Sequence, residues 1–221
     1  MRLFNWLLGR TVEKPHVSNL PLNFDLDKIL EAINNKEANR TNFWNMLSFA
    51  IPRSLYKPPQ DRQTQILNLA CGPCIEGDVL NSYFGNKNLG ELSDKVIQTG
   101  IDIDEANESI RLYPFKFVCD DLTKPAHAQD IPTNVDIVVI RHQQCMSINA
   151  PWKTIFKQAV DRVSENGIIL ITSYGKIEHD IMVNIMRELG AKVILDEATP
   201  NAKSMGWPNV FMDGNVAIFK K

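Results

Sequence analysis

The stretch of sequence that decides the fold reads Gln65-Ile-Leu-Asn-Leu-Ala-Cys-Gly-Pro-Cys-Ile-Glu76. A short apolar run leads into a turn of small residues around Gly72, and a helical pattern begins near Ile75. This order predicts a strand, a tight turn and a helix, the opening unit of a nucleotide-type α/β fold. A dinucleotide site would need three glycines at G-x-G-x-x-G, and the third is missing here, which argues against pyrophosphate recognition.

The chain after this unit predicts further strands that alternate with helices. Apolar and β-branched runs cover residues 95–102, 115–119, 134–141 and 167–173, and two more at 191–196 and 215–219 have no helical pattern between them. Apolar residues recur at helical spacing over residues 152–163 and 177–189. Strands that alternate with helices favour an α/β fold, in which helices cover both faces of a mostly parallel sheet.

Acidic residues follow the second and third expected strands. Asp102, with Ile103 after it, ends the second strand, where a carboxylate can accept hydrogen bonds from the hydroxyl groups of a ribose. Asp120 and Asp121 follow the third strand. A solvated turn in which an aspartate caps the backbone is the alternative for this pair, and we favour it for Asp120.

The opening unit resembles motif I of the class I S-adenosylmethionine (SAM) dependent methyltransferases, whose usual form is D/E-x-G-x-G-x-G. Asn68, Ala70, Gly72 and Cys74 stand at its four defined positions, so one glycine is kept and the replacements are small. Small side chains suit a turn whose backbone must approach a bulky ligand. The alternative is a generic strand-to-helix turn. Residues 100–104 (Gly-Ile-Asp-Ile-Asp) resemble motif II of the same family.

The resemblance covers residues 65–221 and implies a doubly wound seven-stranded sheet, mostly parallel, with an antiparallel last strand. It also implies SAM as cofactor and S-adenosylhomocysteine as product. The residues that would bind the cofactor lie at the ends of the first four strands. They are Asn68, Ala70, Cys71 and Gly72 for the methionine portion, Asp102 and Ile103 for the ribose, Asp121 and Leu122 for the adenine, and Arg141 beside them.

Two residues at the end of the fourth strand are the candidate catalytic residues. His142 is placed to act as a base where the methyl acceptor must lose a proton, because histidine titrates near neutral pH. A structural hydrogen bond at the strand end is its alternative. Arg141 could hold a carboxylate or phosphate of the substrate in a bidentate manner, or it could pair with Asp120 or Glu76.

The composition restricts the partners. The 221 residues carry a formal net charge of −2, and no long block of lysine or arginine is present, so general nucleic-acid binding is not favoured. The Asn/Asp-Pro-Pro-Tyr/Phe tetrad of base-modifying methyltransferases is absent after the fourth strand, which favours a small-molecule substrate. No apolar run is long enough for a transmembrane segment. The sequence leaves open whether the chain forms a homodimer.

The cysteines give no metal prediction. Cys71 and Cys74 form a single C-x-x-C pair, and no second pair supplies the other half of a zinc site. Their small size in the turn already explains them. We therefore expect no metal, reduced thiols and a cytoplasmic protein.

Residues 1–64 form an N-terminal helical extension in this interpretation, with one amphipathic stripe over 26–33 and an aromatic segment over 41–50. The resemblance implies that such helices cap the cofactor and shape the substrate pocket, and the alternative is that they only cover one face of the sheet. The segment 201–214 is expected to be a loop whose Trp207, Phe211 and Met212 line an apolar pocket or pack on the sheet.

The sequence thus predicts a SAM-dependent methyltransferase that acts on a small molecule. A protein that binds SAM without catalysis, or a regulatory subunit with a degenerate motif I, is the first alternative. A nicotinamide-dependent oxidoreductase is the second, against which the missing third glycine argues.

Overall fold

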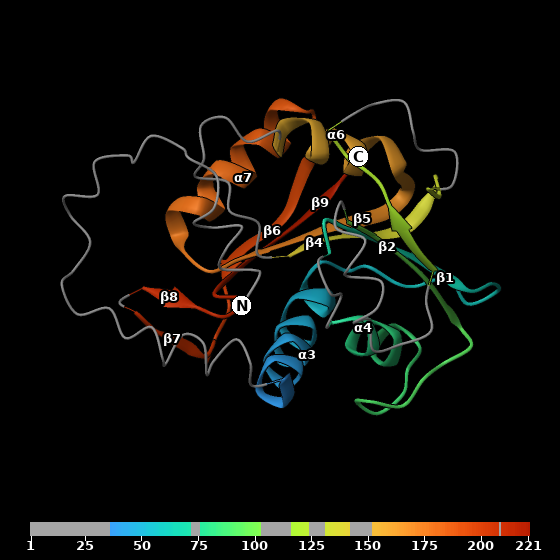
Figure 1. The fold of residues 1–221 in the computed structure, drawn as a ribbon, viewed down its shortest axis with the longest axis horizontal. Coiled ribbons are helices and arrows are strands. Elements are labelled where there is room, and N and C mark those ends of the chain that lie inside the picture. The colour runs from blue at the N-terminus through green and yellow to red at the C-terminus, as the bar shows by residue number, and fades with distance from the viewer. Residues whose placement is uncertain (1–35, 72–75, 103–115, 124–130, 142–151, 208) are drawn as a thin grey trace.

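A seven-stranded sheet with the order β3-β2-β1-β4-β5-β9-β6 forms the centre of the molecule in the computed structural model (Figure 1). The structure describes residues 36–71, 76–102, 116–123, 131–141, 152–207 and 209–221. The strands of this sheet are β1 (Thr64–Leu69), β2 (Val96–Asp102), β3 (Lys116–Cys119), β4 (Val135–Arg141), β5 (Val163–Ser173), β6 (Lys192–Ala198) and β9 (Asn215–Lys220). The helices are α3 (Lys36–Arg53), α4 (Gly77–Phe84), α6 (Trp152–Arg162) and α7 (Lys176–Glu188).

The topology confirms the expected doubly wound sheet. Strands β1 to β5 pair in parallel, and the last strand, β9, is antiparallel to both β5 and β6. The chain runs outward from β1 to β3 and then returns to β4 on the other side of β1. The carboxyl ends of β1 and β4 therefore flank the switch point of the sheet, where ligands of such folds bind.

Each central strand contributes to two cores, because side chains alternate between the faces of a strand. Val138 of β4 and Ile169 of β5 belong to the core beside α6 and α7. Their chain neighbours Ile137 and Ile168 belong to the core beside α3 and α4. Figure 1 shows the two helix pairs on opposite faces of the sheet. Because β4 is buried on both faces, all of its residues are apolar except for two charged ones.

The aromatic segment 41–50 lies within α3, as expected. Phe43, Met46 and Leu47 of this helix are fully buried against the sheet and α4. The helix thus covers one face of the sheet, which was one of the two roles considered for it. The stripe over residues 26–33 lies outside the described residues.

The segment 201–214 is not a plain loop, and that prediction was wrong. It forms a hairpin of β7 (Ser204–Trp207) and β8 (Val210–Phe211). Met212 is buried and packs with Met205, whereas 37% of Phe211 is exposed. The hairpin is hard to predict because Gly206 and Pro208 interrupt the alternation that marks a strand. Within the described part of the chain, no helix has the length and hydropathy of a membrane span.

Candidate functional site

The turn after β1 begins with an alanine in a glycine-like conformation. Ala70 has a φ angle of 52°, in the left-handed region that disfavours residues with a Cβ atom. Next to it, the amide of Cys71 donates to the carbonyl of Ile101 in β2, at 3.0 Å. Ala70 stands at a glycine position of the motif that the sequence resembles, so the backbone here keeps the shape for which that glycine would be suited. Gly72 and Cys74 lie outside the described residues.

Asn68 at the end of β1 reaches the start of α4. Its Nδ2 donates to Oε1 of Glu76 at 2.5 Å, and the exposed fraction of both residues is 4%. The Oδ1 atom of Asn68 is buried and has no hydrogen-bond partner among the described residues. Buried acceptors usually have a partner, so this oxygen marks a position for a donor. Sequence reasoning treated Glu76 only as a pairing partner for Arg141 and missed its bond to Asn68.

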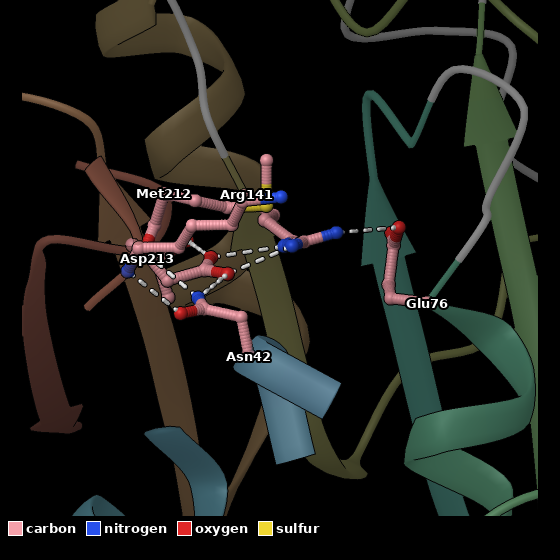
Figure 2. Close-up of polar contacts among 7 residues, drawn as sticks. Asn42, Glu76, Arg141, Met212 and Asp213 are labelled. Atoms are coloured by element: carbon pink, nitrogen blue, oxygen red, sulfur yellow. Dashed lines mark hydrogen bonds and ion pairs between the residues drawn. The ribbon is translucent and has the colours of Figure 1, made fainter. Parts of the chain in front are cut away.

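Arg141 at the end of β4 lies in a buried polar network (Figure 2). Its Nε and Nη2 atoms donate to the two carboxylate oxygens of Asp213, at 2.9 and 2.7 Å, and its Nη1 is 3.5 Å from Oε2 of Glu76. The guanidinium also lies over the ring of Phe43, 4.4 Å from its centroid. Burial lowers the pKa of Arg141, but the charge and hydrogen bonds of Asp213 outweigh burial, so the pKa is raised.

Asp213 joins three parts of the chain at this point. Its carboxylate accepts from Thr172 Oγ1 of β5 at 2.8 Å and from Asn42 Nδ2 of α3 at 3.2 Å, in addition to Arg141. Asn42 also donates to the carbonyl of Met212, at 2.8 Å. Asp213 itself has a φ of 48° in the turn before β9. The network therefore fastens α3 and the segment before β9 to the carboxyl edge of the sheet (Figure 2).

Of the pairings considered for Arg141, the structure shows the one with Glu76 and adds a closer one with Asp213. Asp213 was missed because Asp213-Gly214 reads as an ordinary turn signal, and nothing in the sequence pairs it with a strand that lies 72 residues away. A bidentate carboxylate already holds this guanidinium, which gives Arg141 a positioning role within the site.

The acidic residues at the end of β2 and directly after β3 also lie at this edge of the sheet. Asp102 is half-buried, and its carbonyl accepts from the amide of Asp120 at 3.0 Å. Oδ1 of Asp121 accepts from the amide and the hydroxyl of Thr123, at 3.0 and 2.6 Å, and Oδ1 of Asp120 accepts from the amide of Asp121. Both aspartates therefore make local turn bonds, which we had favoured for Asp120 alone.

The remaining candidate site residues are Leu122, Cys71, Ile103 and His142. Leu122 is buried and packs in the core beside α6 and α7. Cys71 is disulfide-bonded, so the expectation of reduced thiols was wrong for this residue. That expectation followed from the default for a cytoplasmic protein, which says nothing about how close two cysteines lie. Ile103 and His142 lie outside the described residues. Among the described residues, no group of side chains could hold a metal ion.

A second polar chain lies at the end of β5. Ser173 Oγ is 3.2 Å from Nδ1 of His179, and Nε2 of His179 is 3.0 Å from Oδ1 of Asp196. The residue types match those of a nucleophilic triad, but Ser173 is fully buried and so is not positioned to attack a substrate. Burial lowers the pKa of His179, and Asp196 partly offsets this effect. We interpret this chain as a structural link between β5, α7 and β6.

Solved structures of SAM-dependent methyltransferases share this arrangement of strands and helices. A TehB-like SAM-dependent methyltransferase from Corynebacterium glutamicum matches with a TM-score of 0.53 at 19% identity, over 87% of this chain and 92% of its own. A SAM-dependent methyltransferase from Archaeoglobus fulgidus matches with a TM-score of 0.58 at 14% identity, over 90% and 100%. The fold is that of the class I SAM-dependent methyltransferases. The resemblance that the sequence showed is thereby confirmed at the level of the fold.

A third structure with this methyltransferase fold is fibrillarin from Aeropyrum pernix with natively bound SAM. It matches with a TM-score of 0.54 at 11% identity, over 80% of this chain and 76% of its own. No family model matches the sequence, and no curated protein matches it. At these identities the likeness describes the fold, and the chemistry has to be argued from the residues.

Proposed function

We propose that this chain is a SAM-dependent methyltransferase with a small-molecule acceptor. The main support for the proposal is the carboxyl edge of β1, where Ala70 adopts a left-handed conformation and the buried Oδ1 of Asn68 has no partner among the residues that the structure describes. A turn of small residues gives room for a ligand, and an unpaired acceptor fits the donor that SAM carries on its methionine portion. The residues present therefore fit the cofactor that the fold implies.

The proposed binding residues divide along the cofactor. Asn68, Ala70, Cys71 and Gly72 would hold the methionine portion, Asp102 and Ile103 the ribose, and Asp121 and Leu122 the adenine. For Leu122 this role is limited to its backbone, because its side chain packs in the core. Arg141 would act indirectly, by fixing Glu76 and Asp213 around the methionine end.

SAM supplies an electrophilic methyl group when it is bound. Methyl transfer is a displacement, so the protein contributes mainly by aligning the acceptor with this group. His142, which follows Arg141 directly, is our candidate for the base that removes a proton from the acceptor. Replacement of His142 by alanine should slow turnover and leave the affinity for SAM unchanged, and equal turnover would refute this role.

The proposal of a small-molecule acceptor is based on the net charge of the chain. The formal net charge of −2 gives no excess of cations with which to neutralise a nucleic-acid backbone. Solved structures with this fold include a ribosomal protein L11 methylase and a fibrillarin, so the fold by itself does not set the acceptor class. A non-catalytic SAM-binding protein is the second candidate function, favoured by the loss of two motif glycines, and turnover with any acceptor would exclude it.

Ribose recognition by Asp102 provides the experiment. Asp102→Ala should weaken binding of S-adenosylhomocysteine about 10- to 100-fold, because a hydrogen bond from a hydroxyl group to a charged carboxylate contributes about 1.5–3 kcal/mol. Asp94→Ala is the matched control, since Asp94 is exposed just before the amino end of the same strand. Calorimetric titration measures both affinities. Equal affinity of Asp102→Ala and the wild type would contradict the assignment.

A further inference from the structure

We propose that Glu76 and Asn68 together bind the ammonium group of the cofactor's methionine portion, with Glu76 supplying the charge that position 68 lacks. The inference rests on the proposed function, and it assigns a role to Glu76, which is not one of the four defined positions of motif I. In the motif, an acidic residue stands where this chain has Asn68. The structure places a carboxylate from eight residues downstream against that asparagine.

The Glu76 side chain is directed to the end of β1 and not to its own helix. Glu76 is the N-cap residue of α4, yet its side chain makes no capping hydrogen bond. Instead, Oε1 accepts from Asn68 at 2.5 Å, and Oε2 faces Arg141 at 3.5 Å. A carboxylate has room for about four hydrogen bonds, so these two contacts leave capacity for a further donor.

The charges around Glu76 favour a cation. Arg141 donates at 2.9 and 2.7 Å to Asp213, which neutralises its charge at close range. The contact of Arg141 with Glu76 is 3.5 Å, beyond the usual range of 2.7–3.2 Å for such hydrogen bonds. These three groups are one guanidinium and two carboxylates, which leaves one negative charge in excess on Glu76. An incompletely neutralised charge is costly in a buried position, so a cationic ligand would be stabilising there.

The unpaired oxygen of Asn68 specifies the same kind of ligand. Its Nδ2 donates to Glu76, and its buried Oδ1 has no partner within the part of the chain that the structure describes. The two residues thus present acceptors side by side. An ammonium group has three donors and no acceptor, so it can bond to Oδ1 of Asn68 and to the carboxylate of Glu76 at once. A carboxylate group of the ligand would be repelled from this position, which fixes the orientation of the methionine portion.

The first test uses the unaltered protein and two ligands. S-adenosylhomocysteine and its deamino analogue, in which hydrogen replaces the amino group, are titrated calorimetrically. We expect the analogue to bind about 10- to 100-fold more weakly, the usual range for a lost hydrogen bond to a charged group. Equal affinities would overturn the inference and leave the proposed function standing. If the protein binds none of the three ligands (S-adenosylhomocysteine, its deamino analogue and SAM), the proposed function is overturned, and the inference with it.

The second test moves the charge. Glu76→Gln should lose most of this factor for S-adenosylhomocysteine and should distinguish it less from the deamino analogue than the wild type does. The double variant Asn68→Asp/Glu76→Gln returns the carboxylate to position 68 and should recover most of the affinity. Glu91→Gln is the control, because Glu91 is exposed and bonds to Asn88 within its loop. Wild-type affinity in Glu76→Gln, or no recovery in a folded double variant, would overturn the inference.

Discussion

The buried pair of Asp213 and Arg141 should dominate the stability of the site, and replacing Asp213 by asparagine tests this. The asparagine keeps the shape and removes the charge, so that the carboxylate left beside the buried Arg141 in this network is that of Glu76, at 3.5 Å. Removal of one partner from a buried ion pair typically costs about 3–5 kcal/mol. For a chain of this size, each kcal/mol lowers the melting temperature by about 2–4 °C, so we expect a decrease of roughly 10 °C.

Urea denaturation and calorimetry measure this loss, and a double-mutant cycle locates it. Arg141→Met should be destabilising to a similar extent, and the double variant should lose clearly less than the sum of the two, because each single variant already breaks the pair. Lys157→Met is the matched control, since its ion pair with Asp161 is exposed and worth at most about 1 kcal/mol. A loss below about 1 kcal/mol for Asp213→Asn would show that this buried pair does not stabilise the site as expected.

Two further predictions concern His179 and Ala70. Burial holds the pKa of His179 below its ordinary value of 6.5, so the unfolded chain binds a proton more readily and the stability of the protein should fall as the pH decreases below 6.5. Urea midpoints measured at several pH values should fall less for His179→Gln than for the wild type. The same pH dependence in both proteins would contradict this prediction. Ala70→Gly should stabilise the protein by up to about 1 kcal/mol by relieving the left-handed alanine. Ala159→Gly in the buried face of α6 should be destabilising in the same denaturation assay, and a loss at position 70 would argue against strain there.

The sheet could be predicted because its signal is local. β4 is buried along its whole length, so its sequence is a near-continuous apolar run that one window reveals. The same holds for the helical stripes of α6 and α7. The hairpin β7–β8 escaped prediction because it is short and contains a glycine within its first strand, so it offers no alternating pattern.

The site was predicted less completely because its contacts join distant parts of the chain. The positions of Asn68, Asp102 and Arg141 follow from strand ends and could be placed on the carboxyl edge. The contact of Asn42 with Asp213 spans 171 residues, and no local pattern reports such a pairing. For Arg141 the sequence left open a substrate group or a carboxylate of its own chain, and the structure shows contacts with Glu76 and Asp213.

Binding of SAM-type ligands by this chain is tested most directly by calorimetric titration of the purified wild-type chain with S-adenosylhomocysteine, with NADH as the reference ligand. We predict saturable binding of the adenosyl ligand and none of NADH, because the turn after β1 lacks the third glycine of a dinucleotide site. Binding of NADH alone, or of neither ligand by a folded protein, would contradict it.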